Sequence, residues 1–224
     1  MKNIKFLIIF LFATVNLMAQ EQISYLALGD SYTIGEAVDS DSTWSQLLVT
    51  KLNQKGIDLK LEKIVATTGW TTDELISAIE KDKELANNTY DVVSLLIGVN
   101  NQYRGYGIKQ YEEEFEFLLK KAIQLAGKKA ENVFVVSIPD YGVTPFVKKN
   151  NKNAELIGKE LKLYNQIAQN ISNDYGVMFF DITPISLKAV WDKTYVAKDE
   201  LHPSAKMYEE WAEYIESSVY LMLK

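Results

Sequence analysis

The sequence alternates between short apolar runs and longer segments in which apolar residues recur every three or four positions. The short runs are rich in Val, Ile, Leu or Phe and are bounded by polar residues, Gly or Pro, which is typical of buried strands. We expect five strands, at residues 23–28, 59–65, 92–97, 133–138 and 177–180. The spacing of the longer segments predicts amphipathic helices between the strands.

Each predicted strand is followed by a predicted helix. The clearest apolar stripe runs through residues 108–125, and Pro203 marks the expected start of the last helix. Because strand and helix alternate along the whole chain, we predict an α/β fold with a parallel sheet covered by helices on both faces. Three longer irregular stretches, residues 100–107, 139–150 and 182–201, follow strands, so they belong to the carboxyl edge of that sheet.

The first 20 residues depart from this pattern. A basic start, an apolar run at residues 6–15 and a small residue at Ala19 fit a secretory signal peptide. The apolar run is short for a membrane span. We therefore predict a signal peptide at residues 1–20, cleaved near Ala19 or Gln20, and a single domain at residues 21–224. The mature protein is expected to be periplasmic or extracellular, without stable membrane insertion.

Composition narrows the possible chemistry. A formal net charge of −6 without a long basic run argues against nucleic acid as a partner. The chain has no Cys, which excludes disulfides, thiolate metal sites and a Cys nucleophile. His202 is the single histidine, so it cannot build a multi-histidine metal site and must supply any Ser–His chemistry.

Polar residues suited to acyl transfer follow four of the predicted strands. This reaction needs a nucleophile, a base, a group that orients the base, and donors for the oxyanion. Ser31 can be the nucleophile and His202 the base, and Asp199 lies three residues before His202, within reach of its ring. The backbone N–H groups of Ser31 and Gly69 and the side-chain amide of Asn100 can bind the oxyanion.

Each of these residues also has an ordinary structural explanation. Asp30 or Ser31 can be the N-cap of a helix after an ordinary strand-to-helix turn. His202 can lie at a helix start, Asp199 can cap a helix, and Gly69 and Asn100 can be turn residues. The joint order of the residues and their placement after strand ends favour the catalytic interpretation.

These motifs resemble those of the SGNH hydrolases, the GDSL-type esterases. Residues 29–31 (Gly-Asp-Ser) match the first block of the family, Gly69 the second, residues 98–101 (Gly-Val-Asn-Asn) the third and residues 199–202 (Asp-Glu-Leu-His) the fifth. The resemblance covers nearly all of the predicted mature chain. It implies a three-layer α/β/α sandwich with a five-stranded parallel sheet and flavodoxin-like topology, and no metal or organic cofactor.

The resemblance also implies a Ser-His-Asp triad and the oxyanion donors named above. Two positions depart from the family pattern. Tyr32 replaces the Leu of the family's popular name, at a position that tolerates change. Asn101 stands where the family usually has an Asp that supports the loop, so local hydrogen bonding is expected to differ while the chemistry survives.

Several residues on or near the site loops are candidate substrate contacts. Aromatic rings suit the faces of sugars, and a guanidinium can bind a carboxylate or phosphate, although loop packing explains any one of these residues equally well. The candidates are Tyr32, Trp70, Asn101, Tyr103, Arg104 and Tyr141.

The resemblance implies a serine ester hydrolase acting on a small-molecule or glycan ester. With the export signal, O-acetyl groups on carbohydrate are the first expectation, and a lysophospholipase or thioesterase is the alternative. A flavin- or nucleotide-binding module is disfavoured, because no Gly-rich phosphate loop follows the first strand. A catalytically silent member that only binds its ligand is the alternative of another class.

Overall fold

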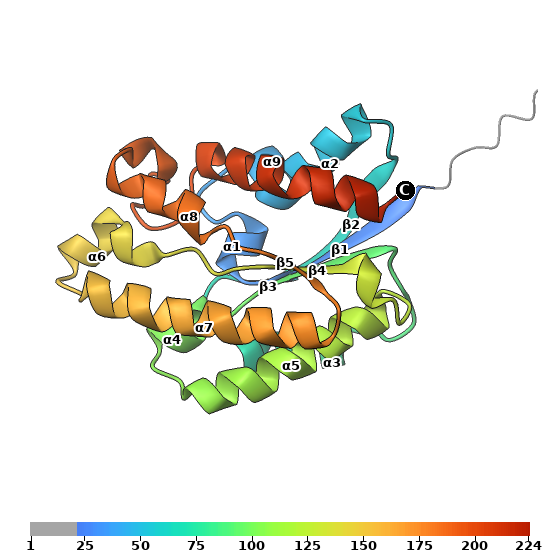
Figure 1. The fold of residues 1–224 in the computed structure, drawn as a ribbon, viewed down its shortest axis with the longest axis horizontal. Coiled ribbons are helices and arrows are strands. Elements are labelled where there is room, and N and C mark those ends of the chain that lie inside the picture. Colours follow the sequence, from blue (N-terminus) through green and yellow to red (C-terminus); the bar gives the residue numbers. More distant parts are fainter. Residues whose placement is uncertain (1–21) are drawn as a thin grey trace, which may run out of the picture.

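The computed structural model describes residues 22–224 and contains a five-stranded sheet between two layers of helices (Figure 1). The predicted signal peptide lies outside the described residues. All strand pairs are parallel, and the order across the sheet is β2-β1-β3-β4-β5, which is the flavodoxin-like order. The predicted fold class is confirmed. The strands are β1 (Ile23–Gly29), β2 (Leu59–Ala66), β3 (Val92–Leu96), β4 (Val133–Val136) and β5 (Met178–Phe180).

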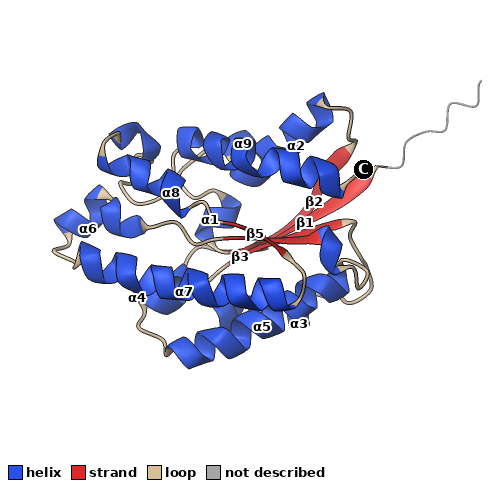
Figure 2. Cartoon of the chain, in the orientation of Figure 1, coloured by secondary structure: helices blue, strands red, loops and turns tan. Residues whose placement is uncertain are grey.

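The helices cover both faces of the sheet (Figure 2). Helices α2 and α9 pack together on one face, and α3, α5 and α7 lie on the other. The helices are α1 (Ser31–Ile34), α2 (Trp44–Gln54), α3 (Thr72–Lys81), α4 (Val99–Tyr103), α5 (Ile108–Leu125), α6 (Pro145–Lys149), α7 (Ala154–Asp174), α8 (Thr183–Ser186) and α9 (Ala205–Met222).

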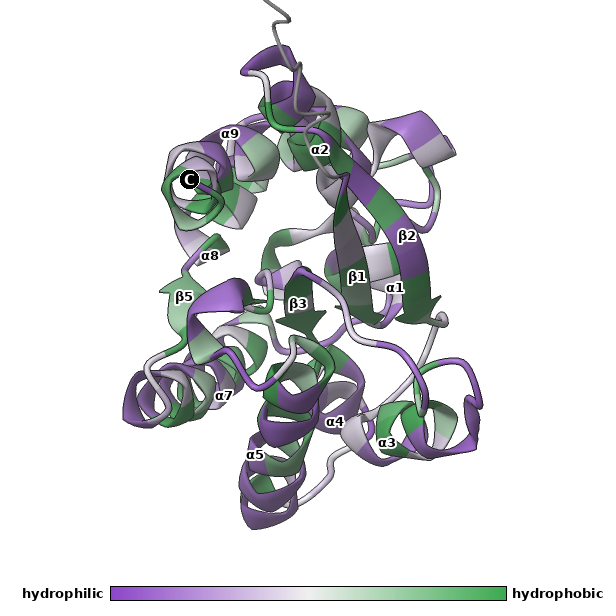
Figure 3. Cartoon of the chain, turned by 90° about the vertical axis from the view of Figure 1, so that its right-hand side faces the viewer, coloured by the Kyte–Doolittle hydropathy of each residue, from purple (hydrophilic) through white to green (hydrophobic). Residues whose placement is uncertain are grey.

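The middle of the sheet forms the core. Every residue of β3 is buried, as a strand covered by helices on both faces requires. Figure 3 shows this hydrophobic strand between the two layers, while α5 and α7 carry many hydrophilic residues. No helix within residues 22–224 is both long enough and apolar enough to cross a membrane.

Two features differ from the sequence prediction. The last helix begins at Ala205, not at Pro203, because Ser204 is its N-cap and accepts a hydrogen bond from the N–H of Met207 (3.3 Å). Pro203 instead pairs with Val196 in an isolated antiparallel bridge. The stretches predicted to be irregular contain short helices, α4, α6 and α8, which are too short to give a periodic apolar pattern.

Three strands end at one level. Gly29 at the end of β1 pairs with Ala66 at the end of β2 and with Leu96 at the end of β3. In this strand order the connections diverge between β1 and β3, where open α/β sheets form a crevice for ligands. Residues that follow these strands therefore meet at the crevice.

Asp30 is fully buried directly after β1. Its Oδ1 accepts a hydrogen bond from the N–H of Tyr32 (3.0 Å) and thereby caps α1. Its Oδ2 is also buried and has no hydrogen-bond partner among the described residues. Burial raises the pKa of this carboxyl from 3.8 to about 7, and the hydrogen bond from Tyr32 offsets only part of that rise.

This buried carboxyl predicts a pH-dependent stability. Between pH 4 and pH 7 the folded protein keeps the proton of Asp30 and the unfolded chain has released it, so stability falls as pH rises through this range and then levels off. Asp30→Asn should remove this part of the pH dependence, which amounts to roughly 4 kcal/mol at most. Urea unfolding of both proteins at several pH values measures it. Identical pH dependence in the two proteins would contradict the prediction.

Candidate active site

Ser31 and His202 meet at the crevice, although they lie near opposite ends of the chain. Ser31 is the first residue of α1, directly after β1, and only 4% of its surface is exposed. The Nε2 of His202 lies 3.0 Å from the Oγ of Ser31. This is hydrogen-bonding distance, so the imidazole can take the hydroxyl proton.

Asp199 contacts the other ring nitrogen of His202. Its Oδ2 lies 2.5 Å from the Nδ1 of His202, and its Oδ1 accepts hydrogen bonds from the N–H groups of Leu201 and His202, both at 3.0 Å. Burial disfavours ionisation of Asp199, but these hydrogen bonds outweigh it and hold the pKa of the carboxyl below its usual value. An ionised Asp199 accepts from Nδ1 and leaves Nε2 free to accept from Ser31.

The loop that carries Asp199 and His202 is closed at its base. Val196 pairs with Pro203, and the N–H of Ala197 donates to the carbonyl of His202 (2.8 Å). The loop therefore returns on itself between η5 (Lys193–Tyr195), a short 3₁₀ helix, and α9. His202 is thereby fixed at the closed base, and Asp199 lies within the loop.

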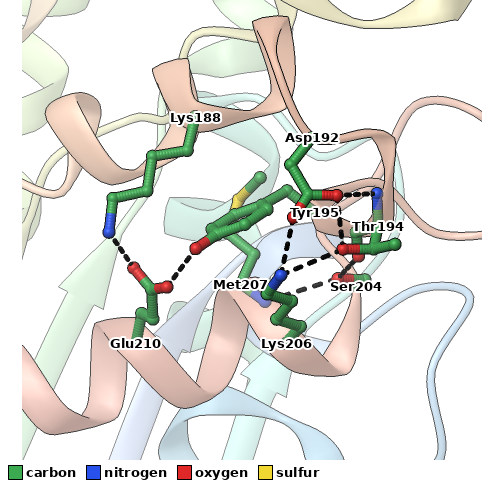
Figure 4. A network of polar contacts seen from close by, with 8 residues as sticks. All are labelled: Lys188, Asp192, Thr194, Tyr195, Ser204, Lys206, Met207 and Glu210. Atoms are coloured by element: carbon green, nitrogen blue, oxygen red, sulfur yellow. Dashed lines mark hydrogen bonds and ion pairs between the residues drawn. The ribbon is translucent and has the colours of Figure 1, made fainter.

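Polar contacts join this base to the start of α9 (Figure 4). The Oγ of Ser204 donates to the carbonyl of Thr194 (2.6 Å), and the Nζ of Lys206 lies 2.7 Å from the Oδ2 of Asp192. Farther along α9, Glu210 accepts from both Lys188 and Tyr195. The histidine loop is thus fixed to a long helix that packs on the sheet.

Gly69 and Asn100 lie on the opposite side of the crevice. Gly69 has a φ of +86°, in the left-handed region that favours glycine. Asn100 lies in the first turn of α4, and its Nδ2 donates to the carbonyl of Trp70 (2.9 Å). A side-chain amide has two N–H bonds, so one remains available for an oxyanion.

A cavity of about 300 Å³ joins these groups. Its lining includes Ser31, Gly69, Asn100 and His202, together with three predicted substrate contacts, Tyr32, Tyr103 and Tyr141. Thr68, Val99, Phe146 and Leu201 also line it. Val99 and Leu201 directly precede Asn100 and His202 in the sequence, and this position is the signal that could have indicated that they line the cavity.

Tyrosine and phenylalanine side chains form one wall of the cavity. The ring of Tyr103 lies 6.2 Å from that of Tyr141 and 6.5 Å from that of Phe146, measured between centroids. Tyr103 is 47% exposed, while Tyr141 is buried and its hydroxyl donates to Gln102 (2.9 Å). Tyr32 packs with its ring edge-on to His202 at 5.7 Å.

Asn101 requires a correction to the sequence prediction. It was expected to contact substrate, but its side chain is fully buried and both its polar atoms bind Thr72. Oδ1 accepts from the N–H of Thr72 (3.0 Å), and Nδ2 donates to the Oγ1 of Thr72 (2.6 Å). Asn101 therefore holds α4 to the start of α3.

Trp70 and Arg104 also lie outside the cavity lining in the described part of the chain. The ring of Trp70 packs against the hydrophobic core, and its carbonyl accepts from Asn100. The guanidinium of Arg104 binds the carbonyl of Gly69 (2.5 Å) and the Oε1 of Glu74 (3.2 Å). Both predicted substrate contacts thus have protein partners.

The chain is similar in fold to several solved structures. No curated protein sequence matches the chain significantly. Among solved structures, the lipase Lip_vut3 from a goat rumen metagenome is similar, with a TM-score of 0.71 and 18% identity over 91% of this chain and 100% of that chain. The psychrotrophic esterase EstA from Pseudoalteromonas sp. has a TM-score of 0.66 and 18% identity over 88% of this chain and 97% of that chain.

A variant of an acetyl-xylooligosaccharide esterase from Geobacillus Stearmophilus has a TM-score of 0.63 and 16% identity over 90% of this chain and 94% of that chain. At these identities the structures show a shared fold. The GDSL-like Lipase/Acylhydrolase family model matches residues 27–210. The resemblance seen in the sequence is therefore confirmed, and the chain belongs to the GDSL-like Lipase/Acylhydrolase family.

Proposed function

We propose that the protein is an exported serine ester hydrolase that removes small acyl groups, foremost O-acetyl groups on carbohydrate. The observation that carries the proposal is the 3.0 Å contact between the Nε2 of His202 and the Oγ of Ser31, with Asp199 on the other ring nitrogen. Export rests on the signal-peptide pattern of residues 1–20.

The reaction follows from these positions. Ser31 attacks the ester carbonyl as His202 takes its proton, and Asp199 stabilises the imidazolium that forms. The N–H groups of Ser31 and Gly69 and the free amide hydrogen of Asn100 bind the negative charge that develops on the carbonyl oxygen. His202 returns the proton to the leaving alcohol, and water then releases the acid from Ser31 by the same steps in reverse.

The size and the lining of the cavity favour a substrate with a small acyl group next to a sugar. Its volume of about 300 Å³ lies at the lower end of the range for ligand pockets, which is roughly 300–1,000 Å³. Tyr103 and Phe146 supply aromatic surface at its wall, and aromatic rings suit the apolar faces of sugars. One of the proteins with a similar fold is an acetyl-xylooligosaccharide esterase, so this scaffold accommodates such a substrate elsewhere.

A substrate panel tests the substrate class. We expect kcat/KM to be higher for acetylated oligosaccharides than for lysophospholipids or acyl thioesters, with p-nitrophenyl acetate as the reference ester. A preference for lysophospholipid or thioester would replace the carbohydrate assignment by one of those classes. Failure of the wild-type protein to cleave any of these substrates would contradict the hydrolase proposal and favour the alternative of a catalytically silent binding module.

Replacement of the nucleophile tests the mechanism. Ser31→Ala removes one hydroxyl from a buried position, so the fold should persist while kcat for p-nitrophenyl acetate falls on the order of a millionfold. Steady-state kinetics measure the loss, and circular dichroism checks the fold. A folded variant with near wild-type turnover would end the assignment of Ser31.

The acid partner is tested by a change of one atom. Asp199→Asn keeps the shape of the side chain but removes the negative charge that orients His202, so kcat should fall about ten-thousandfold. Glu200→Gln is the matched control, because Glu200 is the next residue and instead pairs with Lys149. Full activity of Asp199→Asn, or an equal loss in both variants, would show that Asp199 is not the orienting residue.

A further inference from the structure

Arg104 is the only arginine in the sequence, and its side chain binds the turn that carries Gly69. One arm of its guanidinium donates to the carbonyl of Gly69 at 2.5 Å, and the other contacts the Oε1 of Glu74 at 3.2 Å. A planar guanidinium can hold two acceptors at once in fixed directions, which a lysine ammonium does less well.

The turn at residues 67–70 needs an outside restraint. The N–H of Trp70 donates to the carbonyl of Thr67 (3.2 Å), and Gly69 occupies the third position with a φ of +86°. A positive φ at this position is the requirement of a type II turn. Glycine adopts negative φ about as readily, so the glycine alone does not select this turn conformation.

Helix α4 supplies that restraint from one face. Arg104 is the C-cap residue directly after α4 and keeps helical backbone angles, so its side chain projects from the same side as that of Asn100, four residues earlier. Asn100 donates to the carbonyl of Trp70 at 2.9 Å, while Arg104 donates to the carbonyl of Gly69. Two consecutive carbonyls of the turn are thereby fixed by the short helix that also presents the Asn100 amide.

Glu74 fixes the guanidinium in turn. Its Oε2 accepts from the N–H of Thr71 (2.9 Å) in the capping box at the start of α3, which orients the carboxylate. The side chains of Arg104 and Glu74 are each 39% exposed, and ion pairs with such exposure contribute little to stability. The arrangement therefore restrains the turn more than it stabilises the fold.

We propose that Arg104 is a positioning residue for the oxyanion hole, which it serves by holding the Gly69 turn in the conformation that directs the Gly69 N–H at the reacting carbonyl. The inference rests on the proposed ester hydrolysis. It replaces the sequence-based expectation that Arg104 binds an anionic group of the substrate. A positioning role lowers kcat for every ester, whereas a substrate contact raises KM for anionic esters alone.

The test compares a neutral with an anionic ester. We expect Arg104→Ala to lower kcat about tenfold to a hundredfold for both p-nitrophenyl acetate and p-nitrophenyl hydrogen succinate, with KM changed less than about twofold. Arg104→Lys should restore part of kcat, because an ammonium can reach one of the two acceptors. Glu74→Gln keeps the capping box and loses the charge that holds Arg104, so its loss should be smaller but of the same kind.

Lys152→Ala is the matched control. The Nζ of Lys152 lies 4.3 Å from the ring centroid of Tyr103, so the variant removes the same charge beside the same cavity without touching the turn. Unchanged kcat in Arg104→Ala, a loss confined to KM for the anionic ester, or an equal loss in Lys152→Ala would overturn the inference while leaving the hydrolase assignment intact. An inactive wild-type protein would overturn both.

The double variant Arg104→Ala with Asn100→Ala gives a second readout. If both residues act through one oxyanion hole, their combined loss in kcat should be smaller than the product of the single losses. Multiplicative losses would mean that Arg104 acts elsewhere. Thermal unfolding of each variant separates these effects from a loss of folded protein.

Discussion

The tight junction between β1 and α1 is the constraint on which the site depends. A β-carbon at Gly29 would clash with the Oγ1 of Thr33 and the carbonyl of Leu96, so only glycine lets the chain turn into α1 directly at the end of the strand. Gly29 pairs with Leu96 at the end of β3, and Ser31 follows Gly29 two residues later. This brings it beside the segment that carries Asn100, and His202 completes the site from 171 residues away.

Much of this arrangement could be predicted because its signals are local. Apolar runs marked the five strands, and apolar periodicity marked α5 and α9. Since parallel strands end at one edge of a sheet, polar residues after strand ends could be assigned to one site. The structure brings Ser31, His202 and Asp199 into contact for that reason.

The roles of Trp70, Asn101 and Arg104 could not be predicted in the same way. Each lies in a polar stretch near the site, but the direction of its side chain or carbonyl depends on partners some thirty residues away in the chain. Local sequence records no such pairing. The start of α9 was missed for a related reason, because Pro203 is a favourable first helical residue until Val196 pairs with it.

Asn101 shows why the departure from the family pattern is compatible with the site. The hydroxyl of Thr72 has one hydrogen, and it donates this hydrogen to Glu114. The residue that faces the oxygen of Thr72 must then supply a donor, which the Asn101 amide does and an aspartate cannot. The hydroxyl of Thr72 therefore binds a carboxylate from Glu114 on α5 and an amide from Asn101 on α4.

The two sides of the site are held by different means, and this follows from what each must do in the proposed reaction. The histidine side must keep one ring nitrogen free to accept from Ser31, so the ring is fixed through its other nitrogen by Asp199. The base of its loop is held by the side chain of Ser204, the N-cap of α9, which donates to the carbonyl of Thr194. The oxyanion side must present N–H groups that are unused before reaction, so it is fixed through its carbonyls. Asn100 and Arg104 bind the carbonyls of Trp70 and Gly69, and neither contact uses the Gly69 N–H that the proposed reaction requires. An oxyanion hole that is held in this way needs no reorganisation as negative charge develops on the substrate. This is the condition under which its hydrogen-bond donors contribute most to catalysis.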